Sequence, residues 1–213
     1  MSPRALLLAL PLCLAPVLAG QVPGWSLSGT ALYMSVLQGD ASRYRVRAGS
    51  WAGAEARADH GHVTLRVEGL SGQLKGDSSG TVARDMRRTA VSVQLHQASW
   101  LLISFEALAF RSQSVTQGVS VWRLYGGGIG LSGGLGIEGL RAELNVTGFP
   151  GASAAPADSF RIPVHLDAGV RLAPDRWPVH FRLGYRVELI YFTSGRAERL
   201  AGLVLGAGLK TPR

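Results

Sequence analysis

The chain has 213 residues, a formal net charge of +8 and a single cysteine, Cys13. This length suits one domain, and a lone cysteine excludes a fold that is held together by disulfides. Apart from Lys75 and Lys210, the basic residues are arginines that stand singly between apolar residues, a pattern that argues against nucleic-acid binding.

The first residues, 1–19, predict a cleaved secretory signal peptide. Arg4 precedes the apolar run Ala5–Ala19, and the small residues Ala19 and Gly20 suit cleavage after Ala19. A membrane anchor is the alternative, but the run is short for a membrane-spanning helix and contains two prolines. We therefore expect residues 20–213 to form one exported domain without cysteine.

Beyond this segment, apolar and polar residues alternate with a period of two, which is the pattern of β-strands. No stretch shows a convincing helical period. In chain order, the predicted strands are Ser26–Leu37, Arg43–Trp51, Gly61–Leu70, Arg87–His96, Ser99–Phe110, Val119–Gly128, Gly136–Thr147, Phe160–Leu172, Trp177–Tyr191 and Leu200–Lys210. Because one or two of these are weak, the sequence predicts an all-β fold of eight to ten strands.

The connections between the predicted strands alternate in length. Longer connections are expected at 38–42, 71–85, 111–117, 148–159 and 193–198, and they alternate with breaks at 52–60, near Gln97, near the glycines of 126–139 and at 173–176. Membrane barrels have short turns at their inner end and longer loops at their outer end. We therefore predict an antiparallel up-and-down transmembrane β-barrel in the bacterial outer membrane.

The clearest part of this pattern is the segment Phe160–Tyr191. It predicts a hairpin of two long strands, Phe160–Leu172 and Trp177–Tyr191, that are joined by a loop at Ala173–Arg176. One face of each strand is apolar, and histidines and charged residues occupy the other face.

Charges on the polar faces select the register of this hairpin. When paired residue numbers sum to 349, Asp167 faces Arg182 and Arg161 faces Glu188. Opposite charges across a strand pair stabilise it by roughly 0.2–1 kcal/mol each. A shift by two residues in either direction loses such pairs, so the sequence predicts this register.

In a membrane barrel the charged faces must point inward, because a charged side chain that faces lipid costs about 2–4 kcal/mol at the midplane. We predict that the interior is plugged by an ion-paired polar network. Its expected members are Arg141, Glu143, Arg161, His165, Asp167, Arg171, His180, Arg182, Arg186 and Glu188.

Large aromatic residues near the strand ends predict two interfacial girdles, as is typical of membrane barrels. The expected members are Trp100, Phe110, Trp177, Tyr191 and Phe192.

Few motifs point to catalysis or to a bound group. His60 and His62 lie close to Asp59, but a metal site would need a further ligand from elsewhere. His165 and His180 have no serine or free carboxylate beside them in the sequence, as a catalytic dyad would need. We therefore expect no cofactor, no metal site and no enzymatic activity.

From Trp122 onward, strands interrupted by glycines carry a family resemblance. The segments are LYGGGIGLSGGLGIEGLRAELNV at 124–146, FRIPVHLDAGVRL at 160–172, HFRLGYRVELIYF at 180–192 and AGLVLGAGL at 201–209. Over residues 122–210 the chain resembles the small outer-membrane barrel superfamily of the OmpA-like kind. The resemblance implies a barrel fold and no particular activity, because the superfamily includes structural, adhesive, channel-like and enzymatic members.

The leading hypothesis is an exported outer-membrane barrel with a structural or loop-mediated interaction role. Its partners would be membrane lipid and, through the outer loops, other components of the envelope. One alternative is a small anion-selective channel, which the excess of arginine favours. The others are a soluble lipocalin-like carrier with the apolar face inward, and an outer-membrane enzyme that modifies lipid.

Overall fold

The computed structural model describes residues 24–40, 45–76, 83–114, 118–155, 159–174, 176–193 and 197–211. The predicted signal peptide, residues 1–19, lies outside the described residues. Among the described residues, no helix is long and apolar enough to cross a membrane.

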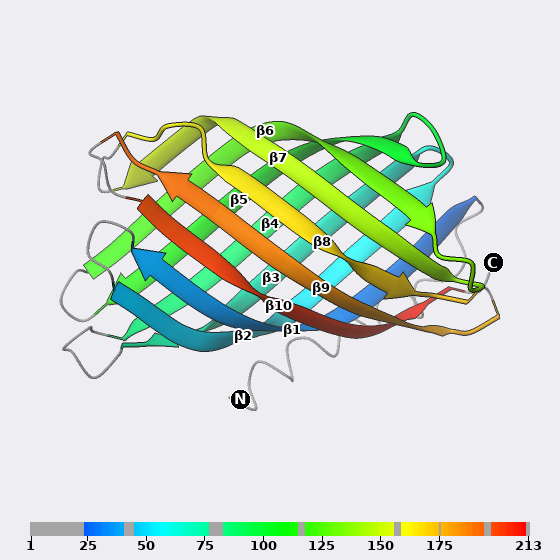
Figure 1. Ribbon diagram of the computed structural model, residues 1–213, viewed down its shortest axis with the longest axis horizontal. Coiled ribbons are helices and arrows are strands. Elements are labelled where there is room, and N and C mark those ends of the chain that lie inside the picture. Colours follow the sequence, from blue (N-terminus) through cyan, green and yellow to red (C-terminus); the bar gives the residue numbers. More distant parts are fainter. Residues whose placement is uncertain are drawn as a thin grey trace.

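Ten strands form one closed barrel in which every neighbouring pair is antiparallel (Figure 1). The strands are β1 (Trp25–Asp40), β2 (Arg45–His60), β3 (Val63–Lys75), β4 (Arg84–His96), β5 (Leu101–Ser114), β6 (Gly118–Gly134), β7 (Leu140–Ala155), β8 (Val164–Leu172), β9 (Val179–Tyr191) and β10 (Ala197–Lys210). The barrel closes where β10 returns to pair with β1. The predicted all-β antiparallel barrel is confirmed, with ten strands.

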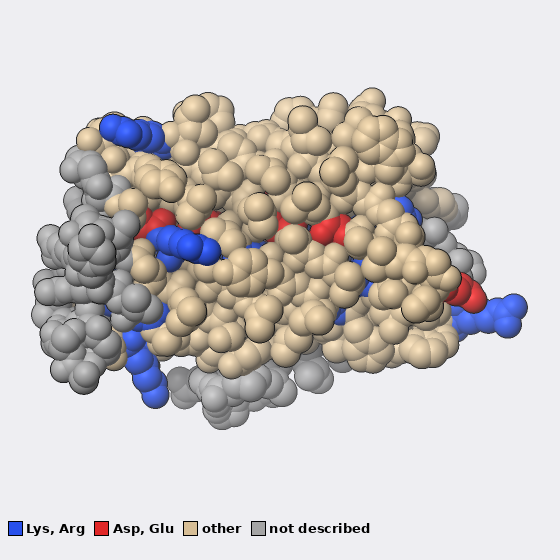
Figure 2. All heavy atoms as spheres, viewed as in Figure 1, with Lys and Arg blue, Asp and Glu red and all other residues tan. Residues whose placement is uncertain are grey.

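The outer wall of the barrel is mainly apolar, and most of the charged residues of the strands point inside. Along β9, Phe181, Leu183 and Tyr185 are exposed on the outer wall, whereas Arg186 and Glu188 are buried in the lumen. Figure 2 shows a side of the barrel that is mostly uncharged, with prominent Lys and Arg side chains at its two ends. The alternative of a lipocalin-like carrier, with its apolar face inward, is therefore wrong.

The two ends of the barrel differ. At the terminal end, where β1 begins and β10 ends, the connections are 61–62, 97–100, 135–139 and 173–178. At the opposite end, which we call the loop end, they are 41–44, 76–83, 115–117, 156–163 and 192–196. The two longest connections, 76–83 and 156–163, both lie at the loop end, although the contrast is smaller than the sequence predicts.

The contrast is smaller because long parts of the predicted loop-end connections are strand. Residues 71–75, 111–114 and 148–155 extend β3, β5 and β7, and residues 52–60, predicted as a terminal-end connection, complete β2. These segments are rich in Ala, Gly, Ser or charged residues, which have low β-propensity. In a closed barrel each backbone has a hydrogen-bonding partner on both sides, and this ladder extends the strands further than side-chain propensity alone would.

A bulge in β7 explains how a segment with a proline remains strand. Tyr125 pairs with Gly151 and Gly127 pairs with Gly148, so two residues of β7, Phe149 and Pro150, stand opposite the single residue Gly126 of β6. A bulge is one of the few places in a sheet where proline is tolerated. It also directs the side chain of Phe149 into the lumen, where that side chain is buried.

The predicted register of the β8–β9 hairpin is wrong by four residues. Observed partners sum to 353: Asp167 faces Arg186, and His165 faces Glu188. The connection spans 173–178 rather than 173–176. Arg161 lies before β8 and is exposed, so the predicted pair of Arg161 with Glu188 does not form.

We predict that Gly126→Ala destabilises the barrel by about 1–3 kcal/mol, the usual cost of overpacking. A methyl group at Gly126 would lie 1.9 Å from the carbonyl oxygen of Gly148, which is backbone of the neighbouring strand. The free energy of unfolding, from urea titrations of the detergent-folded protein, measures this loss. Gly133→Ala on the same strand is the matched control, since a methyl group there meets nothing within 4 Å. Equal stability of the two variants would contradict the role given to Gly126.

Candidate functional site

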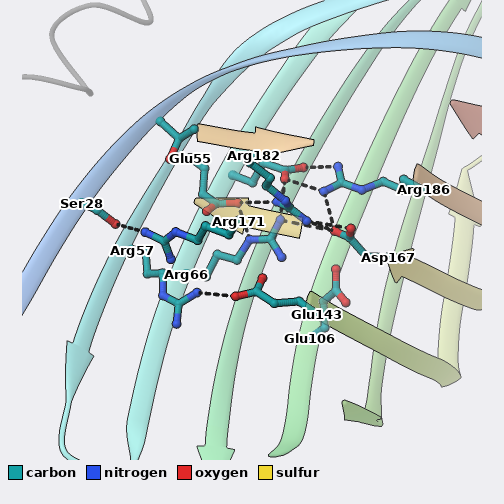
Figure 3. A network of polar contacts seen from close by, with 12 residues as sticks. Ser28, Glu55, Arg57, Arg66, Glu106, Glu143, Asp167, Arg171, Arg182 and Arg186 are labelled. Atoms are coloured by element: carbon teal, nitrogen blue, oxygen red, sulfur yellow. Dashed lines mark hydrogen bonds and ion pairs between the residues drawn. The ribbon is translucent and has the colours of Figure 1, made fainter. Parts of the chain in front are cut away.

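Three sections fill the lumen along its length. At the mouth of the loop end, a small polar cluster joins Gln38 and Arg84 to Glu198. Next to it lies an apolar plug, whose buried members are Leu32, Met34, Val36, Trp51, Leu70, Leu74, Met86, Ala90, Leu108, Phe110, Trp122, Leu124, Phe149, Ile190, Phe192, Leu200 and Val204. The section toward the terminal end is a network of arginines and carboxylates (Figure 3). An eight-stranded barrel is just wide enough for ordinary side chains, so ten strands need arginines and large aromatic residues to fill the space.

Arg186 of β9 lies at the centre of the charged section and is completely buried. Its two terminal nitrogens donate to the carboxylate of Glu68 at 2.7 and 2.8 Å. One of them also donates to Asp167 at 2.9 Å. Because Glu68 belongs to β3, this pair ties together two walls that face each other across the lumen.

Arg88 of β4 makes a second connection across the lumen. It donates to Glu188 of β9 at 2.7 Å, to Glu106 of β5 at 3.4 Å and also to Glu68. On the far side of Glu106, the Nδ1 atom of His165 lies 3.0 Å from its carboxylate. Glu68 and Glu106 therefore each join groups from different strands.

The register of β8 and β9 follows from this three-dimensional network. Arg182 still reaches both oxygens of Asp167 at 2.7 Å, so the predicted contact forms, but diagonally rather than directly across the hairpin. Arg182 also donates to Glu55 of β2 at 3.2 Å, while Arg186 takes the direct position opposite Asp167. The observed register gives both arginines carboxylate partners on other strands.

At the terminal end of the lumen, the paired side chains are more exposed than those at the centre of the network. Arg57 pairs with Asp59 at 2.9 Å and lies 3.8 Å from Glu143 on the opposite wall. Arg171 stands directly opposite Arg182 and donates to the hydroxyl of Ser28 at 3.3 Å.

The remaining predicted network residues lie in different places. His180 is buried, with Nε2 2.7 Å from the hydroxyl of Thr30. Arg141 is exposed at the rim of the barrel, where it donates to the backbone carbonyl of Ser99 at 3.3 Å. Together with the exposed Arg161, it lies outside the network that the other predicted residues help to form.

Among the inward side chains that the structure describes, arginines and carboxylates are equal in number. The inward arginines are Arg47, Arg57, Arg66, Arg84, Arg88, Arg171, Arg182 and Arg186, and the inward carboxylates are Glu55, Asp59, Glu68, Glu106, Glu143, Asp167, Glu188 and Glu198. The predicted site omitted the charged residues of 52–60, which was expected to be a connection. The alternation of Glu55, Arg57 and Asp59 with alanines was the signal that could have identified them.

The space left between these groups is small. A polar cavity of about 30 Å³ lies near Arg57, Arg171 and His180, and a second of about 10 Å³ lies beside Arg88 and His165. A single water needs roughly 10–15 Å³ measured in this way. Within the part of the chain that the structure describes, the lumen therefore holds water-sized cavities.

The aromatic residues that were predicted as girdles divide into two groups. Trp100, Trp177 and Tyr191 are exposed near the barrel ends, on the outer wall or in an adjoining turn. Phe110 and Phe192 are buried in the apolar plug, and both pack edge-on against Trp122. Their assignment to the girdle is wrong, because both lie on faces that point inward. Phe110 shares its face of β5 with Ser104 and Glu106, and Phe192 lies on the same side of the chain as the buried Ile190.

The two histidines that were considered as catalytic candidates are buried inside the barrel. His165 and His180 both point into the lumen, away from the outer wall, and their hydrogen-bond partners are Glu106 and Thr30. In the described ranges, no group of three or more His, Cys, Asp or Glu side chains could hold a metal ion. His60 instead stacks on Trp25 and bonds to the backbone of Gly24.

We predict that Arg186→Met lowers the free energy of unfolding by about 3 kcal/mol, the lower end of the range for breaking a buried ion pair. The loss stays at this end because Glu68 and Asp167 keep other arginine partners. Urea titration followed by tryptophan fluorescence measures it. The control is Arg161→Met, which alters an exposed arginine and should change stability by less than about 0.5 kcal/mol. A variant at Arg186 as stable as this control would contradict the central role of Arg186.

Comparison with known proteins gives structural similarity but no family. No family model and no curated protein matches the chain. Its structure is similar to that of Neisserial surface protein A (NspA), with 14% identity, a TM-score of 0.45, and coverage of 90% of this chain and 100% of that one. It is also similar to Ail, the attachment invasion locus protein of Yersinia pestis, with 15% identity, a TM-score of 0.33, and coverage of 89% and 100%. The translocator domain of the autotransporter NalP from Neisseria meningitidis matches at 9% identity and a TM-score of 0.33 over 96% of this chain and 93% of that one. At such low identities and scores, these matches do not assign the chain to a family.

Proposed function

We propose that this protein is a bacterial outer-membrane β-barrel with a plugged lumen and a structural or loop-mediated role in the envelope. The observation that carries the proposal is the distribution of polarity in the wall. Leu183, Tyr185 and Leu203 are exposed outward, whereas Asp167, Arg186 and Glu188 are buried inside. A large exposed apolar surface around a charged interior suits a barrel in hydrocarbon.

The height of the apolar wall fits a bilayer. On β5, the outward residues are apolar from Leu101 to Ala109, and the next outward residue is Arg111. Nine residues of a tilted strand are enough to cross the hydrocarbon core, for which about 9–11 are needed. Trp100 and Trp177, exposed at the terminal end, supply aromatic residues at one interface.

The loop end is the side that we expect to face the exterior of the cell. Outer-membrane barrels place short turns toward the periplasm and longer loops outside. The terminal end, with the two-residue turn 61–62, would then face the periplasm. Other components of the envelope would be contacted through the connections at the loop end.

The filled lumen argues against a role as a channel. An apolar plug and buried ion pairs occupy the lumen in series, so an ion would have to displace both. The excess of arginine over carboxylates on the polar faces suggested an anion channel. Among the inward side chains that the structure describes this excess is absent, because eight arginines meet eight carboxylates.

We predict that the protein fractionates with membranes and that its folded form migrates differently on a gel from the boiled form. Barrels held by a closed ladder resist detergent until they are heated, because no strand edge is free to open. Extraction with and without detergent, followed by gels of heated and unheated samples, checks both expectations. A chain that stays soluble without detergent would contradict the membrane assignment.

A second prediction concerns conductance. Purified protein in a planar lipid bilayer should show no steady channel current at either polarity, because the apolar plug and the buried ion pairs obstruct the lumen. A general porin that is inserted under the same conditions serves as the control for detection. Steady unit currents, selective for anions, would replace the proposed role with that of a channel.

A further inference from the structure

Three arginines form a patch on the outer wall near the loop end. Arg87 of β4, Arg111 of β5 and Arg123 of β6 are all exposed and point away from the lumen. Arg87 stands directly opposite Arg111, and Arg123 lies two residues from Val121, which is the direct partner of Arg111. Direct partners lie about 5 Å apart and diagonal neighbours about 7–8 Å apart, so long side chains can meet over one spot. We call these three residues the arginine patch.

The patch lacks the carboxylates that balance every arginine cluster in the lumen. In the ranges that the structure describes, none of its three members forms an ion pair. Asp85 is the nearest acidic residue along β4 on the same face, and its carboxylate accepts a hydrogen bond from Gln73 instead. Like charges directly opposite each other destabilise a strand pair, so the pair of Arg87 and Arg111 needs a negative partner from outside the chain.

The depth of the patch places it at the boundary between hydrocarbon and water. On β5, Arg111 directly follows the nine-residue apolar stretch that ends at Ala109. On β6, the outward neighbour of Arg123 toward the membrane centre is the exposed Tyr125, an aromatic residue of the kind found at membrane interfaces. At this depth an outward arginine costs little and meets lipid headgroups rather than acyl chains.

We propose that the arginine patch binds the phosphate of an anionic lipid headgroup in the leaflet at the loop end. Two guanidinium groups on adjacent strands form a fork that matches the oxygens of a phosphate, and each can donate two parallel hydrogen bonds. The exposed polar side chains of Gln113 and Ser153 flank the patch and add neutral donors. The inference rests on the proposed membrane location, because the lipid must lie beside the outer wall.

The test uses the mature chain, folded in micelles that contain phosphatidylcholine and phosphatidylglycerol and then examined by native mass spectrometry. We expect the wild type to retain phosphatidylglycerol in preference to phosphatidylcholine. The double variant Arg87→Gln with Arg111→Gln should lose this preference, on the order of five-fold for each arginine removed. Excess inorganic phosphate should leave the retained lipid in place.

Arg199→Gln is the matched control. Arg199 is an exposed outward arginine at the same end of the barrel, but its direct partners are Leu189 and Gly39, so no arginine stands opposite it on either neighbouring strand. If this variant lost as much lipid as the double variant, the lipid would be held by general attraction between charges. That result would overturn the proposal that the arginine patch is a binding site. Displacement of the retained phosphatidylglycerol by inorganic phosphate would overturn the proposal that the bound phosphate belongs to a lipid.

Heated and unheated gel samples of each variant identify the folded molecules, and only these are compared. Arg111→Gln alone provides a milder change if the double variant does not fold. A barrel that inserts into the micelles but shows no preference for phosphatidylglycerol overturns this inference and leaves the proposed function intact. A chain that never enters the detergent phase overturns the proposed function itself.

Discussion

The structure depends on one constraint, which is that charges enclosed in the lumen must be paired across it. A buried ion that loses its partner costs several kcal/mol. Arg186 and Arg88 meet this constraint by sharing Glu68, which lies on a strand distant from Arg186 around the barrel. The register of β8 and β9 and the small size of the cavities between the paired groups both follow from this pairing.

Much of the fold was accessible from the sequence, because the period of two is a local property of the chain. It gave ten strand candidates and the inward direction of Asp167 and Arg186. The register of the hairpin was not accessible, since it is set by Glu55 and Glu68 on strands far away in the sequence. Phe110 was misplaced because it adjoins a predicted outer loop, although Ser104 and Glu106 share its face of β5 and mark that face as inward.

The contents of the lumen bear on where recognition can occur. An apolar plug and charged clusters fill the described part of the ten-stranded barrel and leave little room for a ligand. The surface offers the connections at the loop end and the outer wall, where Arg111 and its neighbours interrupt the apolar surface. The envelope role that we propose therefore rests on the surface of the barrel.

The pairing of walls that face each other has a consequence for how the barrel is assembled. Arg88 of β4 and Arg186 of β9 each have one carboxylate partner within a hairpin, Glu68 and Asp167. Each also has a partner on a distant strand across the lumen, Glu188 and Glu68. A growing sheet lacks these contacts across the lumen until its two edges meet. Closure of β1 on β10 forms them in one step, so intermediates with an open seam are disfavoured and the barrel should form in an all-or-none manner.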